Sequence, residues 1–144
     1  MHQQDIEKIE TMLGYSLPPE YKAFLMQHTN ELIRAGNILK YYATLWTDAE
    51  EIIQGNLDAR TYAADMVIGE DESHQQSWPE YYLVVGTNGG GDFWFIDRTG
   101  AKSGIWFWQH EENSITQENI SFDEYMANIR RDMENPNQWP GQRL

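Results

Sequence analysis

The chain has 144 residues, a length that suits one domain with its own hydrophobic core. It has no cysteine, which excludes a disulfide framework, a thiol nucleophile and a thiolate metal site. Its formal net charge of −13 repels the phosphate backbone of nucleic acids, so we expect no nucleic-acid partner.

The first part of the chain shows the spacing of two helices. Ile6, Ile9 and Leu13 recur at intervals that place them on one apolar helix face, and a glycine follows where a helix stop is expected. A second helix is predicted to begin near Pro19, because proline is tolerated in a first turn, where its missing N–H would be unpaired anyway. We expect this helix to end around Asn30.

The middle of the chain is predicted to contain short elements and a loop. Within residues 31–46, Ile38-Leu39 and the stretch from Tyr41-Tyr42 through Leu45-Trp46 suit a short strand or two. Thr47 and Glu50 have the spacing of a capping box, in which each side chain accepts a hydrogen bond from a free backbone N–H, so a third helix is predicted there. Residues 69–79 are polar and acidic and are expected to form an exposed loop.

The clearest secondary structure lies between Tyr81 and His110. Three runs of aromatic and β-branched residues, separated by glycine-containing turn sequences, are predicted to be strands that pair antiparallel as a meander. Ser121 and Glu124 then form a second capping box, which opens a closing helix. The three strand runs are 81–85, 93–96 and 105–108.

These elements predict an α+β fold in which an antiparallel or mixed β-sheet meander packs with N-terminal and C-terminal helices. We expect a single domain over residues 1–134, followed by a polar tail, residues 135–144, that contains Trp139.

The predicted strands are apolar on both faces. Phe93 and Phe95 point to one face of the sheet, whereas Trp94 and Ile96 point to the other. Helices can cover one face. The second face is either covered by other segments or left open as an aromatic patch for a partner, and the sequence leaves both possibilities open.

The negative charge is concentrated in the middle of the chain. Between Lys40 and Arg98 there are eleven acidic residues and only one basic residue, Arg60. Such a field would speed the encounter with a basic protein. An excess of carboxylates is also an ordinary source of solubility, and charge alone does not separate these two interpretations.

Several short motifs follow one another in an order typical of one family. In their order and spacing, over roughly residues 5–130, the chain resembles the SUKH superfamily, which includes yeast Smi/Knr-type regulators and many bacterial proteins. It departs from the pattern after the second helix, where many members carry Asn-Gly-Gly and this chain has Asn30-Glu31-Leu32. The matching motifs are Leu17-Pro18-Pro19-Glu20-Tyr21, Trp78-Pro79, Leu83-Val84-Val85-Gly86, Gly90-Gly91-Asp92 and Ser121-Phe122-Asp123-Glu124-Tyr125-Met126.

The resemblance implies a mixed-sheet α+β domain without catalytic residues. For bacterial members it implies a cytoplasmic immunity protein that protects the producing cell from a polymorphic toxin, and many such toxins are nucleases or nucleobase deaminases. It assigns no binding residues, because the toxin-binding surface varies among members. No apolar run approaches the ~20 residues of a membrane-spanning helix, and residues 1–5 lack the basic start of a secretory signal, so we expect a cytoplasmic protein without membrane contact.

Motifs that could suggest an enzyme fail on spacing or context. Residues 86–92 contain the glycines of a phosphate cradle, but no lysine follows and the next segment is a predicted strand, so a hairpin turn is the better interpretation. His110-Glu111-Glu112 begins like a zinc motif but has no second histidine four residues on. We therefore expect no catalytic residue, no cofactor and no metal.

The acidic loop leads directly into the aromatic strands, which predicts a partner-binding surface. Aromatic anchors within a rim of carboxylates would suit a basic active-site cleft, where carboxylates can take the positions of substrate phosphates. In the alternative interpretation, Trp78 and Trp106 belong to the core. The candidate residues are Glu70, Asp71, Glu72, Trp78, Glu80, Trp94, Trp106, Trp108, Glu111 and Glu112.

The residues and the resemblance together favour a non-catalytic immunity protein that neutralises a basic toxin, such as a nuclease, by occluding it with an acidic surface. We expect a monomer or a weak dimer. One alternative is a carbohydrate or small-ligand binding module built on exposed aromatics, which a deep aromatic-lined pocket would favour. The other alternative is a general regulatory or scaffold module.

Overall fold

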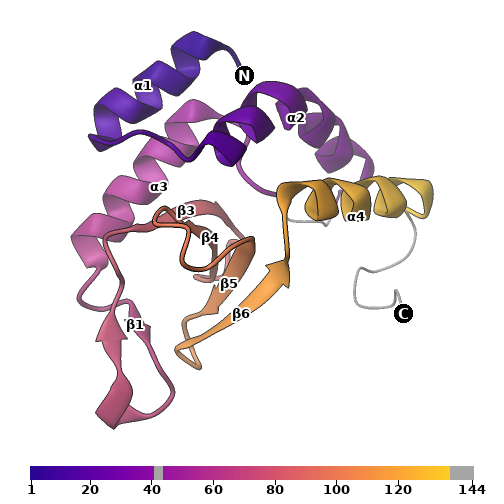
Figure 1. Cartoon of the computed structure of the whole chain (residues 1–144). Helices are drawn as coiled ribbons and strands as arrows, with labels where there is room; N and C mark the ends of the chain where they lie inside the picture. The colour runs from indigo at the N-terminus through magenta and orange to yellow at the C-terminus, as the bar shows by residue number, and fades with distance from the viewer. Residues whose placement is uncertain (41–43, 137–144) are drawn as a thin grey trace.

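Four helices and a four-stranded antiparallel sheet form most of the molecule. The computed structural model describes residues 1–40 and 44–136. In Figure 1, α1 (Gln3–Leu13), α2 (Pro19–Ile38) and α4 (Phe122–Glu134) lie over one side of the sheet, and α3 (Ala49–Tyr62) lies next to β3. The predicted α+β domain is confirmed.

The first helix forms as its spacing predicts. Ile6, Ile9 and Leu13 are buried on one face of α1. Gly14 adopts φ +84°, a left-handed conformation that glycine reaches without a steric penalty, and its N–H donates to the Glu10 carbonyl at 2.8 Å. The glycine therefore ends the helix.

The second helix begins at Pro19, as expected, but it extends to Ile38, so the predicted end at Asn30 is wrong. Leu32 and Ala35 are fully buried and continue the apolar stripe of the first half of the helix. The chain has Glu31-Leu32 where many SUKH members carry two glycines, and both residues favour helix. Burial and propensity thus act together to lengthen α2.

Neither Ile38-Leu39 nor Leu45-Trp46 forms a strand, so the prediction is wrong for these described residues. Residues 31–38 are helical instead. Trp46 is not part of a strand, although its backbone N–H donates to the Val85 carbonyl at 2.9 Å. Tyr41-Tyr42 and the predicted tail from residue 137, with Trp139, lie outside the described residues.

The third helix is confirmed, although its predicted capping box is not. The residue before its first turn is Asp48, one position after Thr47, and it makes no side-chain capping bond. The helix is held instead through its buried face, where Asn56 joins it to the sheet. The Asn56 amide nitrogen donates to the Val84 carbonyl and its oxygen accepts from the Val84 N–H, both at 2.8 Å.

The sheet has the order β3-β4-β5-β6, with every neighbouring pair antiparallel. Three of its strands, β3 (Tyr82–Thr87), β4 (Phe93–Asp97) and β5 (Ile105–Gln109), confirm the predicted meander. The fourth, β6 (Ser114–Asn119), was not predicted, because its sequence is mostly polar. It lies at the edge of the sheet, where only one side of the strand is paired.

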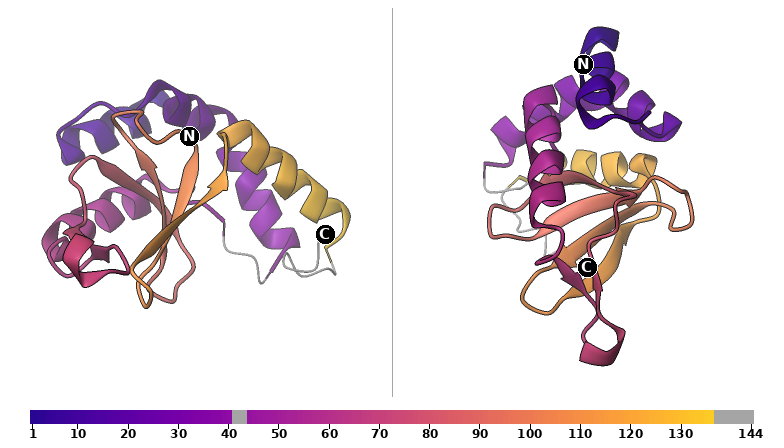
Figure 2. Two further views of the ribbon diagram at one scale, coloured as in Figure 1. Left: turned by 60° about the horizontal axis from the view of Figure 1, so that its bottom comes forward. Right: turned by 90° about the vertical axis from the view of Figure 1, so that its left-hand side faces the viewer.

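The acidic stretch after α3 is more ordered than a loop. Two short strands, β1 (Val67–Ile68) and β2 (Gln76–Ser77), pair antiparallel and enclose a short 3₁₀ helix, η1 (Glu72–His74). The predicted exposure is confirmed for residues 70–77, which are all exposed, but not for Trp78, which is buried. Figure 2 shows this β1–β2 hairpin projecting from the body of the molecule.

The closing helix α4 begins at the predicted place. Ser121 Oγ accepts a hydrogen bond from the Glu124 N–H at 3.0 Å, which is the forward half of the capping box. Glu124 Oε2 accepts instead from the Ile120 N–H at 2.5 Å, one residue before the cap. The box is therefore half confirmed, and both bonds satisfy free backbone donors at the helix start.

The second sheet face, which the sequence allows to be covered or open, is largely covered. The first face packs against the helices through residues such as Leu83 and Ile96. The second face is largely covered by the β1–β2 hairpin and by Trp78, which follows it. The buried cluster there consists of Ala59, Met66, Ile68, Trp78, Tyr82, Val84, Phe95 and Trp108.

Candidate functional site

Two acidic segments that are far apart in the sequence meet at one end of the molecule. The Gly69 N–H, at the start of the hairpin loop, donates to the Asn113 carbonyl at 2.7 Å, and Asn113 lies in the turn between β5 and β6. Both segments lie at the lower end of the view in Figure 1. We call this surface the acidic end. Its exposed carboxylates are Glu70, Asp71, Glu72, Glu111 and Glu112.

The hairpin loop holds its central carboxylate in place. Asp71 accepts hydrogen bonds from the Ser73 N–H at 3.1 Å and the Ser73 hydroxyl at 2.9 Å, and it lies 2.8 Å from Nδ1 of His74. The hydrogen bond with His74, followed by those from Ser73, holds the pKa of Asp71 below its usual value. Asp71 therefore stays ionised at neutral pH, and its charge has a fixed direction.

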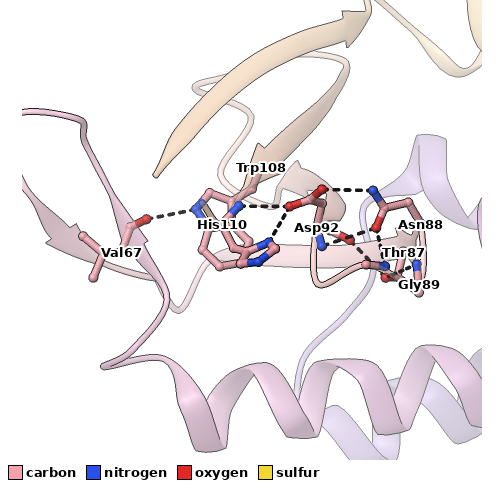
Figure 3. Close-up of polar contacts among 8 residues, drawn as sticks. Val67, Thr87, Asn88, Gly89, Asp92, Trp108 and His110 are labelled. Carbon is pink, nitrogen blue, oxygen red and sulfur yellow. Dashed lines mark hydrogen bonds and ion pairs between the residues drawn. The ribbon is translucent and has the colours of Figure 1, made fainter. Parts of the chain in front are cut away.

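A second contact fixes the base of the hairpin to the sheet. Trp108, on β5, donates a hydrogen bond from its indole Nε1 to the Val67 carbonyl on β1, at 2.9 Å (Figure 3). Its ring is buried under the hairpin. Two bonds thus hold the acidic loop, one at the base of the hairpin and one, from Gly69, at the start of the loop.

The β5–β6 turn is held by the glycine-rich hairpin that connects β3 to β4. Asp92 accepts from the His110 N–H at 3.0 Å, lies 2.7 Å from His110 Nδ1, and accepts from the Asn88 amide at 3.0 Å (Figure 3). Burial opposes ionisation of Asp92, but these hydrogen bonds outweigh it and lower its pKa. The ionised Asp92 anchors the segment that leads into Glu111.

The same hairpin is not a phosphate cradle, as the sequence predicts. The N–H groups of Gly89 and Gly90 donate to Thr87 Oγ1 and Asn88 Oδ1, at 3.1 and 2.8 Å, so neither is free for a ligand. Gly91 adopts φ +95°, and a Cβ there would lie 3.0 Å from the His110 ring. The glycines serve the turn and the close approach of the histidine.

Two of the predicted tryptophans are buried in the core. Trp78 is 6% exposed and Trp108 4% exposed. The Trp78 ring meets Trp108 edge-on at 5.5 Å and Phe95 at 5.0 Å. This agrees with the interpretation of Trp78 as a core residue, which the sequence left open. In this arrangement Trp78 and Trp108 offer little surface to a partner and instead support the hairpin.

The remaining predicted residues are not gathered in one place. Trp106 is half-buried on the second sheet face, where its indole nitrogen donates to the Ser103 carbonyl at 2.9 Å. Trp94 lies on the opposite face, 5.1 Å from the ring of Phe107. Glu80 is exposed beyond the end of the hairpin. The structure therefore brings together the five carboxylates of the acidic end, but not all four tryptophans.

Sequence reasoning named Trp106 but missed two half-buried apolar side chains that lie with it on the second sheet face, Phe93 and Ile115. Phe93 stacks almost parallel on the buried Trp108, at 5.8 Å and 3°, and Ile115 lies opposite Trp108 on β6. With Trp106, they pack against the edge of the cluster that the hairpin covers. We call Phe93, Trp106 and Ile115 the apolar strip. Ile115 is the only apolar residue within 114–119, so no periodic signal pointed to it.

The surface also contains two open clefts away from the acidic end. One, of about 490 Å³, lies between α2, the β4–β5 loop and the start of α4 and is lined by Phe24 and Phe122, among others. The other, of about 550 Å³, lies between the end of α1, α3 and the segment after β2, and it contains Arg60 and Arg98.

Among residues 1–40 and 44–136, no group of three or more His, Asp or Glu side chains is placed to hold a metal ion. Within the same residues, no helix combines the length and the apolar character that crossing a membrane requires.

Comparison with known families agrees with the resemblance seen in the sequence. The model of the SMI1 / KNR4 family (SUKH-1) matches residues 1–128. The chain therefore belongs to this family. No curated protein and no solved structure matches it.

Proposed function

We propose that this member of the SMI1 / KNR4 family is a non-catalytic immunity-type protein that binds and neutralises a basic toxin through its acidic end. The observation that carries the proposal is the convergence of five exposed carboxylates from two segments joined by the Gly69–Asn113 hydrogen bond. Family membership is compatible with this role, and it is also compatible with the regulatory role of the yeast relatives.

The charge at the acidic end supports recognition of a cationic cleft. Glu70, Asp71 and Glu72 project on the hairpin, and Glu111 and Glu112 directly precede Asn113, whose carbonyl accepts from Gly69 at the start of the hairpin loop. No lysine or arginine lies within residues 61–97, so these charges are not neutralised along the chain. A concentrated field of this kind increases the rate of association with a basic partner and makes that rate depend on salt.

The rigid support of the loop favours occlusion of an active site. A nuclease holds its substrate phosphates with basic residues, and ionised carboxylates can take the positions of those phosphates. Because the hairpin is bonded at its base and at the start of its loop, little ordering cost remains to be met on binding. The neighbouring apolar strip of Phe93, Trp106 and Ile115 would add the desolvated contact that carries affinity.

The test is co-expression of the chain with a toxin encoded beside it, followed by measurement of association rates with the purified toxin. In the test variant, Glu70→Gln, Asp71→Asn and Glu72→Gln are combined. In the control, Glu7→Gln, Glu51→Gln and Asp65→Asn remove the same charge from exposed positions on α1, on α3 and after α3.

We expect the test variant to associate at least about tenfold more slowly than the control at low salt, with a smaller dependence on salt. If both variants slow association equally, net charge acts and the acidic end is not the binding surface. If the unchanged chain gives no protection against the toxin, the immunity role itself is wrong.

A further inference from the structure

The cleft between α1 and α3 concentrates positive charge in a chain that is otherwise strongly acidic. Figure 1 shows the end of α1 close to α3, and the cleft opens between these helices and the segment after β2. Arg60 and Arg98 both line it. They are two of only ten basic residues, against 23 acidic ones. We call this site the arginine cleft.

The two guanidinium groups are fixed around one aromatic ring. The Arg98 guanidinium lies 3.6 Å from the centre of the Tyr15 ring, and that of Arg60 lies 5.6 Å from it. Each also donates to a backbone carbonyl, Arg98 to Glu80 at 3.2 Å and Arg60 to Leu13. The arginines are therefore held in place before any ligand arrives.

This arrangement leaves hydrogen-bond donors without acceptors. Neither Arg60 nor Arg98 forms a salt bridge with a residue in the described part of the chain. The Nε of Arg98 is buried without a hydrogen-bond partner, and so is the indole Nε1 of Trp78, which lines the same cleft and is 6% exposed. Buried donors are rarely left unpaired in folded proteins, so these point to an acceptor supplied by a ligand.

The phenol of Tyr15 adds a further donor. Burial raises the pKa of Tyr15 and outweighs the two arginines, which favour the phenolate. Tyr15 therefore keeps its proton at neutral pH and can donate it in a hydrogen bond to an anion.

We propose that the arginine cleft binds the carboxylate of a small organic acid or of a polypeptide carboxyl terminus. Two arginines and one glutamate, Glu80, line the cleft, which gives a formal charge of +1 and suits a monoanion better than a phosphate dianion. Guanidinium groups bind planar carboxylates through paired hydrogen bonds. The rings of Tyr15 and Tyr82 and the ring of Pro79 line the same cleft and supply apolar walls for the rest of the ligand.

This site is independent of the acidic end, because it uses none of the five carboxylates and has the opposite charge. Its volume of about 550 Å³ lies within the range of small-ligand sites. If the chain binds no toxin, the proposal for the arginine cleft still stands. If the cleft binds no carboxylate, the proposal for the acidic end still stands.

The experiment titrates the whole ¹⁵N-labelled chain with benzoate and, separately, with its neutral analogue benzamide. The reporters are the indole N–H signal of Trp78, assigned with a Trp78→Phe variant, and the backbone N–H signal of Arg98. We expect saturable shifts with benzoate and binding at least about tenfold weaker with benzamide, because the charge-assisted hydrogen bonds are lost.

A second pair of probes separates the two sources of the carboxylate. A glycine–serine peptide that ends in phenylalanine is titrated with a free carboxyl terminus and with an amidated one. If the free peptide binds at least tenfold more tightly than benzoate, the cleft recognises a polypeptide end. If it binds no better than benzoate, the cleft recognises a small organic acid.

Arg98→Gln should weaken carboxylate binding by at least about tenfold. Arg34→Gln is the matched control, because it removes the same charge from an exposed position on α2. The proposal is overturned if neither carboxylate probe binds better than its neutral counterpart, or if both variants weaken binding equally. The comparison of charged and neutral probes uses the unchanged protein, so it remains decisive even if Arg98→Gln unfolds the chain.

Discussion

The side chain of Asn56 takes the place of a neighbouring strand beside β3, and its removal should destabilise the fold more than any change at the surface. Asn56 is 4% exposed and hydrogen-bonds both backbone groups of Val84, each at 2.8 Å. Its amide also donates to the Ile52 carbonyl at 2.8 Å. Asn56→Ala therefore leaves the N–H and the carbonyl of Val84 buried without these partners.

Each buried group left unpaired costs about 1–3 kcal/mol, so we expect Asn56→Ala to lower the free energy of unfolding by about 3–5 kcal/mol. A domain of this size is stable by about 5–15 kcal/mol, so the loss is a large fraction of the total. The measurement is urea unfolding followed by tryptophan fluorescence. Asn30→Ala, an exposed position on α2, is the control and should change stability by less than about 0.5 kcal/mol.

Asn56→Asp tests the same geometry through pH. A carboxyl group at this site would be buried against the Ile52 and Val84 carbonyls, which raises its pKa above the unfolded value of about 3.9. Because the folded pKa is raised, the free energy of unfolding of the variant should be closest to that of the unchanged protein below pH ~4. The difference between the two should grow as pH rises. The role of Asn56 would be refuted if the loss of stability in Asn56→Asp did not depend on pH. It would also be refuted if Asn56→Ala lowered the free energy of unfolding by less than about 1 kcal/mol.

Three further predictions concern the glycines and the Asp92 contact. Gly89→Ala should lower the free energy of unfolding by about 1–2 kcal/mol, because of its φ of +81° alone. Gly91→Ala should lower it further, because the added Cβ would also press on the His110 ring. Thermal unfolding of both variants measures the difference. Gly36→Ala, in open space within α2, should raise the melting temperature, with a gain of about 0.5–1 kcal/mol. The pKa of Asp92 is lowered in the folded state, so its ionised form adds stability above the unfolded pKa of about 3.9, and this stability is lost as pH falls through the folded pKa. Asp92→Asn should therefore flatten the loss of stability on acidification between pH ~5 and ~2. An unchanged profile of stability against pH would show that the His110 contact does not stabilise the fold.

Local chemistry made most of the elements predictable from the sequence. The stop at Gly14, the start at Pro19 and the cap at Ser121 each depend on neighbouring residues alone. The end of α2 depends on burial, because Leu32 and Ala35 form part of the core only after the helices have packed. The spacing of Leu32 and Ala35 does continue the apolar stripe of the helix, but only their burial separates a longer helix from the short strands predicted there, which is why the predicted helix was too short.

The candidate site was predictable in part for a similar reason. The carboxylates around Glu70 and Glu111 can be read from the sequence, but their meeting depends on one backbone hydrogen bond between Gly69 and Asn113. The arginine cleft could not be foreseen, because Arg60 and Arg98 come together only through the packing of α3 beside the sheet. Residue type indicates what a side chain can bind, whereas the fold decides which side chains act together.

The β1–β2 hairpin has two roles that its residues keep apart, and this separation makes the acidic end testable. Its base covers the second sheet face and is bonded to Trp108, whereas its tip carries Glu70, Asp71 and Glu72 into solvent. Changes at the tip should therefore alter association without loosening the core. Trp108→Phe removes the indole donor to Val67 and should do the reverse: a less stable hairpin with all its charges intact. If that variant slows association with a toxin as strongly as the loss of the three carboxylates does, the rigid presentation of the charges matters as much as their number.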